Sequence, residues 1–168
     1  FEGKVNFKMQ GKSDLDANMG VVIPSLQTIA RIEGFNLVVL DGETFSELSK
    51  MLMFKNKEKN IIDSLSFEMM VHGNEMEVFP SLVTVDRYKV AIGGTHKLDM
   101  TYNYHVSVLK SPMPFKAGID LSGDLEDYDF KITKAKYKYL FSDKKKQRQK
   151  ADSSLIKRKM EILEQLKF

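Results

Sequence analysis

The 168-residue chain contains no cysteine and no long run of apolar residues. The missing cysteines exclude disulfide frameworks and thiolate chemistry, although they fit an oxidising compartment as well as a reducing one. The longest apolar runs span only a few residues, whereas a membrane-spanning helix needs roughly 18. Because the chain starts at Phe1, already inside a patterned segment, we expect it to be cut from a longer protein, with any signal peptide or membrane anchor upstream.

The usual signatures of catalysis and of phosphate binding are missing as well. Gly93-Gly94 lacks both the GxGxxG spacing and a Gly-Lys-Ser/Thr ending, and no helical pattern follows it, so the pair predicts a hairpin or a bulge. The Gly-x-Ser-x-Gly turn of α/β-hydrolases is absent. An acidic cluster lacks the spacing and the final Glu of a calcium-binding loop, so we expect a solvated turn around Asp124, Glu126, Asp127 and Asp129.

The three histidines do not have the spacing of metal ligands. His72 lies in a turn signal, His96 follows a glycine pair, and His105 has the opposite parity to the apolar residues of its strand. None pairs at i, i+4 on a helix or at i, i+2 on a strand, so we expect solvated strand or turn histidines. The sequence therefore predicts no catalytic residue, metal or cofactor, and no enzyme. A weaker alternative, a hydrolase or transferase using one of these histidines, requires a titratable partner in the same pocket.

Alternating apolar and polar residues dominate the rest of the chain and predict strands. Phe1, Val5, Phe7 and Met9 share one parity, and the strongest alternation runs from Leu98 to Val108. Further strands are expected near 29–40, 62–72, 76–85, 88–94, 119–123, 128–132 and 137–141. Short spacing with polar turns favours a meandering antiparallel sheet over βαβ units, so the predicted fold class is α+β, mostly β.

One amphipathic helix is predicted at 44–54, between the strands. Thr44 and Glu47 form a capping box, and Phe45, Leu48 and Leu52 make an apolar stripe at helical spacing. A single stripe implies a single packed face, so we expect this helix to lie on the sheet.

The end of the chain is basic, whereas the rest is acidic. Residues 131–168 hold 13 Lys and Arg against 4 Asp and Glu, and the residues before them hold 13 against 19. A helix is expected at 152–167, with an apolar stripe at Leu155, Ile156, Met160, Ile162, Leu163 and Leu166. We therefore divide the chain into a β-rich domain, 1–142, and a basic amphipathic C-terminal helix, 143–168. The candidate contacts with a membrane or a partner are Lys144, Lys145, Lys146, Arg148, Lys150, Lys157 and Arg158.

Three roles for this basic segment stay open. It is a solvated helix or appendage that packs its stripe on the sheet, or it contacts an anionic membrane or a partner protein, or it contacts nucleic acid. Nucleic acid is the weakest of these, because the acidic body lacks the platform of aromatic and basic strand residues that stacks bases.

The methionines raise a further hypothesis. Six of the ten fall in predicted helix or strand segments and are expected to fill the core. If a long face of the sheet is apolar and no helix covers it completely, that face would form a groove able to hold acyl chains.

The order of these motifs resembles the C-terminal region of AsmA-family envelope proteins. A strand enters a turn, an amphipathic helix follows, and a strand leaves the helix, turns, and returns through small residues into a long strand that begins Leu-Asp and ends near Tyr. The matching pieces, which span roughly residues 20–125, are Leu40-Asp41-Gly42, Thr44 to Phe54, Ile62 to His72, Glu77-Val78-Phe79-Pro80, Tyr88 to Gly94, and Leu98-Asp99 with Tyr102 and Tyr104.

The resemblance implies a non-enzymatic periplasmic domain of a protein anchored in the inner membrane by an N-terminal helix. It implies a part in outer-membrane biogenesis or lipid transport, a long curved apolar sheet face that is incompletely covered, and phospholipid or lipopolysaccharide acyl chains or envelope proteins as partners. The charged run at Lys144 and the helix after it are not part of the family pattern. The alternative function is a structural or protein-interaction module that docks a partner through its basic C-terminal helix.

Overall fold

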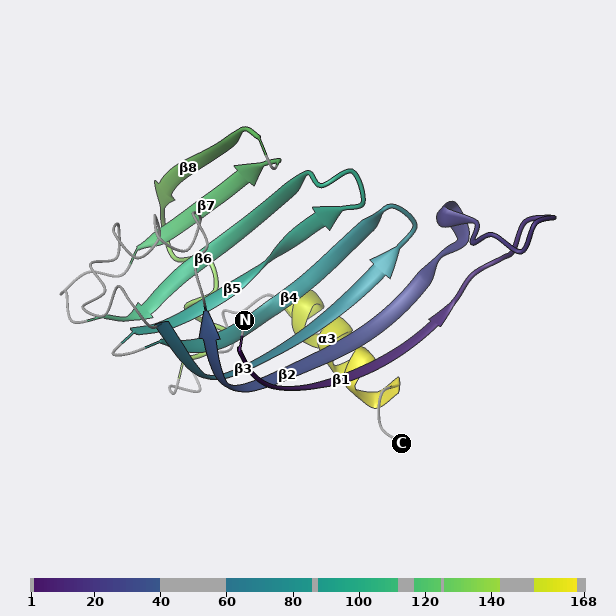
Figure 1. Cartoon of the computed structure of the whole chain (residues 1–168). Coiled ribbons are helices and arrows are strands. Elements are labelled where there is room, and N and C mark those ends of the chain that lie inside the picture. The colour runs from purple at the N-terminus through teal and green to yellow at the C-terminus, as the bar shows by residue number, and fades with distance from the viewer. Residues whose placement is uncertain are drawn as a thin grey trace.

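The computed structural model describes residues 2–39, 60–85, 88–111, 117–124, 126–142 and 153–165. Within these ranges, eight strands form one antiparallel sheet in which every strand pairs with the next along the chain (Figure 1). The strands are β1 (Glu2–Lys12), β2 (Gln27–Val39), β3 (Asn60–His72), β4 (Glu75–Val85), β5 (Tyr88–Lys97), β6 (Tyr102–Lys110), β7 (Gly118–Gly123) and β8 (Tyr128–Thr133). A 3-10 helix, η1 (Ile23–Ser25), precedes β2, and the helix α3 (Ser153–Gln165) follows the sheet. The predicted class, α+β and mostly β with a meandering antiparallel sheet and a C-terminal helix, is confirmed.

The sheet is open, with β1 and β8 at its edges, and it is strongly curved, so that it has a concave and a convex face (Figure 1). Because side chains alternate along a strand, each strand sends one parity to each face. Residues that pair across neighbouring strands lie on the same face of the sheet. Apolar positions of successive strands therefore line up as rows of apolar side chains across the sheet, and polar positions line up on the opposite face.

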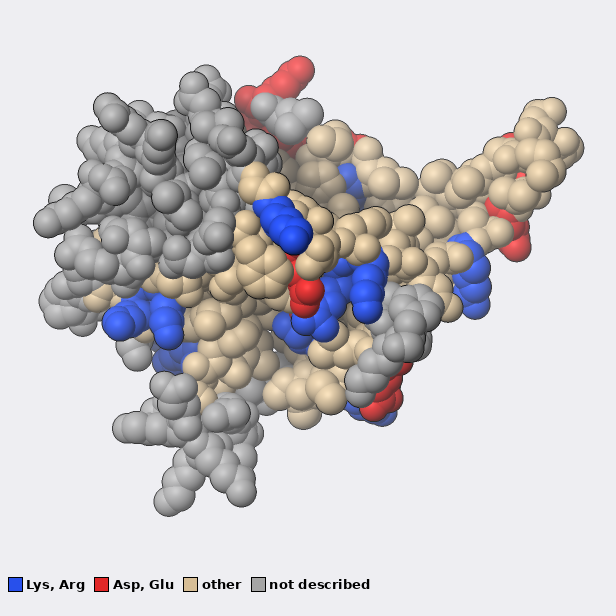
Figure 2. All heavy atoms as spheres, turned by 60° about the horizontal axis from the view of Figure 1, so that its bottom comes forward, with Lys and Arg blue, Asp and Glu red and all other residues tan. Residues whose placement is uncertain are grey.

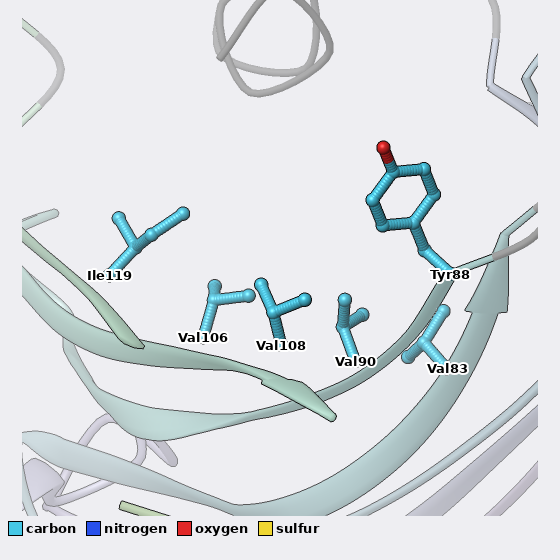
Figure 3. Packing of buried hydrophobic residues seen from close by; sticks show 6 residues of the cluster. All are labelled: Val83, Tyr88, Val90, Val106, Val108 and Ile119. Carbon is cyan, nitrogen blue, oxygen red and sulfur yellow. The ribbon is translucent and has the colours of Figure 1, made fainter. Parts of the chain in front are cut away.

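The buried core lies on the concave face. Its centre is a cluster of six residues from β4 to β7 that point into the hollow of the sheet, as Figure 3 shows: Val83, Tyr88, Val90, Val106, Val108 and Ile119. Four partly buried residues pack against this cluster, namely Leu65, Phe67, Ile92 and Phe130. A smaller cluster lies on the convex face, where Ile162 of α3 packs against Phe79 of β4.

The expected start of the sixth strand is wrong. The alternation from Leu98 onward is not all strand, because β6 begins only at Tyr102 and the chain turns between Lys97 and Thr101. The Asp99 side chain accepts hydrogen bonds from the backbone and hydroxyl of Thr101, and Met100 has a positive φ of 70°. Asx hydrogen bonding of this kind specifies a turn and overrides an apolar alternation.

Gly93-Gly94 forms no hairpin. Both glycines lie inside β5, and the pairing of β4 with β5 shifts register between Val78 and Ser81, opposite Gly93. The bulge alternative is confirmed, with the extra residue on β4 rather than at the glycines. A Cβ at Gly93 would lie 2.9 Å from Pro80, so the glycine makes room for the bulged strand.

The strand expected at 137–141 is also absent, because these residues form successive turns. The helix expected at 44–54, the Leu40-Asp41-Gly42 turn and the basic run 144–150 lie outside the described residues. Among the helices that are described, none is long and apolar enough to cross a bilayer.

Candidate functional site

The concave face carries two apolar rows, each of which begins at one edge of the sheet. Phe7, Ile32 and Phe67 stand opposite one another on β1, β2 and β3. A second row runs from β5 to β8 through Ile92, Val106, Ile119 and Ile132.

Both rows end in exposed side chains at the sheet edges. Phe7 is 56% exposed and Ile132 is 74% exposed, whereas Val106 and Ile119 in the middle are buried. The apolar surface of this face therefore extends past its buried centre to both edge strands. On β1 the exposed side chains of Val5, Phe7 and Met9 share this face, and exposed apolar patches mark interaction or ligand-binding sites.

The convex face of the edge strands is polar by contrast. On β1 the alternate positions Lys4, Asn6, Lys8 and Gln10 face this side, and all four are exposed. Figure 2 views the molecule from the side of the convex face and shows Lys, Arg, Asp and Glu side chains spread over it. The edge strand β1 is thus apolar on its concave side and polar on its convex side.

The structure separates the three histidines. His72 ends β3 and lines a hollow of about 450 Å³ at the ends of β1, β2 and β3, together with residues such as Gln10 and Gln27. His96 lies on the concave face beside Tyr102 and Tyr104. His105 is on the convex face, and the prediction that it is solvated is wrong, because only 3% of it is exposed.

His105 is buried because it has partners that sequence reasoning did not find. Its Nδ1 lies 2.5 Å from Oδ1 of Asp120, and its Nε2 lies 2.9 Å from Oγ of Ser107. The backbone N–H of Lys136 donates to the same Nε2 at 3.1 Å, so Nε2 is an acceptor and Nδ1 carries the proton toward Asp120. The signal available in the sequence was parity, since Asp120 stands opposite His105 on β7.

The Asp120–His105–Ser107 order has the form of a catalytic triad, but its surroundings do not suit one. Ser107 is 0% exposed, and its Oγ accepts a hydrogen bond of 2.9 Å from the backbone N–H of Tyr137. A nucleophile must reach a substrate, and this hydroxyl is covered by the segment that it holds. The Tyr137 ring packs edge-on against the His105 ring, with centroids 5.2 Å apart. The network therefore fastens residues 134–142 to the convex face.

Electrostatics follow the same arrangement. Burial lowers the pKa of His105, against the opposing effect of its hydrogen bond to Asp120. The Lys136 ammonium, 2.7 Å away, and the His105 hydrogen bond lower the pKa of Asp120 to about 2. Near neutral pH the network thus holds a neutral imidazole beside a carboxylate that is paired with an ammonium.

The helix α3 is held on the convex face by its own basic residues. Arg158 bonds Glu77 of β4 at 2.7 Å, and Lys159 pairs with the buried Glu68 of β3 at 2.7 Å. Of the residues predicted to contact a membrane or partner, Arg158 therefore contacts the sheet, while Lys157 points outward with 80% of its side chain exposed. The other predicted contacts lie outside the described residues.

Beside α3 is a small apolar hollow of about 190 Å³. It is lined by Leu140 and Phe141 of the fastened segment, and by Ile156 and Met160 on the helix. Ile156 and Met160 belong to the predicted apolar stripe but stay exposed, whereas Ile162 is buried. The stripe is thus divided between the sheet and this hollow.

The predicted acidic turn is confirmed for Asp124, Glu126 and Asp127, whereas Asp129 lies in β8. The Asp124 carboxylate accepts the backbone N–H groups of Glu126 and Asp127, both at about 2.9 Å or less. Within the part of the chain that the structure describes, no three His, Asp or Glu side chains gather closely enough to hold a metal ion.

Comparisons of the chain with protein-family models, with curated proteins and with solved structures found no match.

Proposed function

We propose that the concave face binds the acyl chains of lipids, and that the protein is a non-enzymatic, AsmA-like domain contributing to outer-membrane biogenesis or lipid transport. In this proposal the full-length protein is anchored in the inner membrane and the domain works in the periplasm. The observation that carries it is the apolar concave face, which ends in exposed residues such as Phe7 and Ile132 at both edges.

The chemistry of the concave face supports a lipid rather than a polar ligand. A polar ligand needs converging donors and acceptors, and the exposed side chains of the concave face are instead apolar, as at Val5, Phe7 and Ile132. Burial of an acyl chain there releases about 0.8 kcal/mol per CH₂ group.

A chain-length series tests this proposal. Saturated fatty acids compete with a fluorescent fatty acid for the purified protein, and their inhibition constants are compared at constant pH and salt. If the chain lies on the concave face, each additional pair of methylenes tightens binding by about 1.6 kcal/mol, or roughly fifteenfold. Affinity that does not change with chain length, or no displacement at all, would contradict acyl-chain binding.

A matched pair of variants locates the site. Phe7→Lys places a charge on the concave face, and Asn6→Lys places the same charge on the convex face of the same strand. Both positions are exposed on an edge strand, so we expect both variants to stay folded. We expect Phe7→Lys to weaken fatty-acid binding about tenfold, because a charge removes roughly one buried side chain of apolar contact, and Asn6→Lys to leave it unchanged. Equal effects would place the ligand elsewhere.

The second candidate function is partner docking through the C-terminal helix. The exposed pair Ile156 and Met160, one turn apart beside the small apolar hollow, favours it. Ile156→Asp together with Met160→Asp would then abolish capture of a partner while thermal stability stays unchanged. A loss of stability in that variant would show that these residues belong to the core instead.

A further inference from the structure

The concave face changes character at the end where β5 turns into β6 and β7 turns into β8. The aliphatic centre gives way there to aromatic rings with polar atoms. The His96 and Tyr102 rings stack with centroids 6.2 Å apart, and the Tyr104 ring lies 6.2 Å from that of Tyr102. These residues share the face of Val106, because they alternate with it along β6 or pair across to it in register. A ligand on the concave side of β8, where Ile132 is exposed, would meet these rings at one of its ends.

Two of the tyrosines flank a glycine, and we call these three residues the slot: Tyr102, Gly123 and Tyr128. Tyr102 on β6 and Tyr128 on β8 both stand opposite Gly123 of β7, so one row reads Tyr, Gly, Tyr across three strands. Neighbouring strands lie about 4.8 Å apart, which puts the two tyrosine Cα atoms roughly 10 Å from each other. Gly123 has a φ of 137°, and a Cβ there would lie 2.2 Å from the backbone of Asp127, so the floor of the slot carries no side chain.

The width of the slot suits one class of group. A cation held by aromatic rings lies within about 6 Å of each ring centroid, so two rings that stand on positions roughly 10 Å apart can both reach a cation between them. Tyr128 is 40% exposed and is braced by an edge-on contact with Phe130 at 5.3 Å, which leaves its ring positioned and accessible. Quaternary ammonium groups are the ligands that such aromatic cages recognise.

The charges of the adjoining turns match this ligand. Asp99 lies in the turn that leads into Tyr102, and three acidic residues, Asp124, Glu126 and Asp127, lie in the turn that leads into Tyr128. Lys97 is the cation of the first turn, and the second turn has none among its described residues. This end of the face is thus negative, which favours a cationic headgroup and disfavours an anionic one.

We propose that the slot formed by Tyr102, Gly123 and Tyr128 binds the quaternary-ammonium headgroup of a lipid whose acyl chain lies along the concave side of β8, where Ile132 is exposed. The position of the acyl chain rests on the proposed function, but the slot itself does not. The specificity is for a cationic end, so fatty acids are weaker ligands than alkyl chains of equal length that end in trimethylammonium.

The first arm of the test uses the headgroup alone. Tetramethylammonium is titrated into the protein while the ring signals of Tyr102 and Tyr128 are followed by NMR, with the signal of Tyr88, at the far end of the same face, as a reference. We expect the two slot tyrosines to shift in a saturable way and Tyr88 to stay fixed. Absence of a shift at both slot tyrosines would overturn the headgroup proposal whether or not the face binds chains.

The second arm compares amphiphiles with the same alkyl chain below their micelle-forming concentration. Dodecyltrimethylammonium should bind about tenfold tighter than dodecyl sulfate and than the neutral dodecyl maltoside. Equal binding of all three would leave the apolar face as a lipid site and refute the slot. Tighter binding of the maltoside would mean that the tyrosines stack a neutral headgroup, which also refutes it. Binding of tetramethylammonium without any binding of dodecyl maltoside would support the slot and contradict the proposed function.

Two variants of Tyr128, one without the aromatic ring and one with it, complete the test. Tyr128→Leu removes one wall of the slot and should reduce the preference for trimethylammonium to about twofold or less, whereas Tyr128→Phe keeps the ring and should keep the preference. Binding of dodecyl maltoside should be the same in both variants. Because Tyr128 is on an edge strand and partly exposed, the result does not depend on whether a change at Tyr102 is tolerated. An unchanged preference in Tyr128→Leu would overturn the proposal.

Discussion

The buried network around His105 gives the sharpest prediction about stability. Ser107→Ala removes one oxygen and almost no volume. The Tyr137 N–H then loses its 2.9 Å acceptor, and the His105 Nε2 loses one of its two donors. A buried polar group left without its partner costs about 1–3 kcal/mol, so we expect Ser107→Ala to lower the free energy of unfolding by about 2 kcal/mol.

His105→Ala should cost more than Ser107→Ala. It leaves the Lys136 N–H and the Ser107 hydroxyl without the Nε2 acceptor, and it opens a cavity beside Tyr137. We expect a loss of about 3–5 kcal/mol. Because the two side chains share one network, the double variant should cost less than the sum of the single variants, by about 1 kcal/mol.

Urea denaturation followed by circular dichroism measures all three variants. Ser122→Ala is the control, because it is the same substitution on the convex face of the neighbouring strand β7. Its free energy of unfolding should stay within about 0.5 kcal/mol of that of the parent protein. Limited proteolysis adds a local readout, because the backbone of residues 134–142, once released from the sheet, should be cleaved faster by trypsin at the exposed lysines of that segment. If Ser107→Ala matched the control in both assays, the network would not fasten this segment and the reasoning would fail.

The remaining predictions follow from three other features of the structure. Burial lowers the pKa of His105 in the folded state, so the unfolded chain binds more protons in acid. The contribution of His105 to the free energy of unfolding should be complete above a pH of about 6.5 and should fall below it by up to roughly 1.4 kcal/mol per pH unit. His105→Gln should remove that decline in urea titrations. The pKa of Asp120 is also depressed, to about 2, so its stabilisation should be lost as pH falls from about 3.8 toward that value, which acid titration of the Asp120→Asn variant would check. Ile162→Ala should cost about 2–4 kcal/mol in urea denaturation, because Ile162 and Phe79 are both almost fully buried against each other. Gly94→Ala should cost about 3 kcal/mol or more by the same measurement, since its Cβ would lie 2.2 Å from the Asn103 carbonyl oxygen; a variant as stable as the parent would contradict that contact.

The strands were predictable because their signal is local. Alternation of Val5, Phe7 and Met9 with polar neighbours requires one apolar face whatever the partner strand is, and β1 has it. The same rule fails where short-range polar contacts compete with it. Leu98 and Met100 continue the alternation of β6, yet the Asp99 hydrogen bonds to Thr101 turn the chain there.

The histidine site was not predictable, because its members are distant in sequence and hydrophilic by type. Parity places His105 on the polar face of its strand, and a polar strand face is solvated by default. Burial came from a later segment, whose Lys136 and Tyr137 backbone amides bind the network 30 residues or more away. Asp120 and His105 share a face because of the register in which β6 pairs with β7, and the parity of each strand does not give that register.

The sequence by itself determined that this protein is a mostly β meander with one apolar sheet face, because alternation is a property of each strand alone. It also determined that α3 is amphipathic. Only the tertiary structure decided which residues meet. Curvature placed Val90, Val106 and Ile119 on the inside of the sheet, and register lined up Tyr102, Gly123 and Tyr128. Arg158, which looked like a surface contact, became the anchor of its helix because Glu77 lies under it. Such pairings depend on the register between strands, and the residue pattern of one strand does not determine its register with the next.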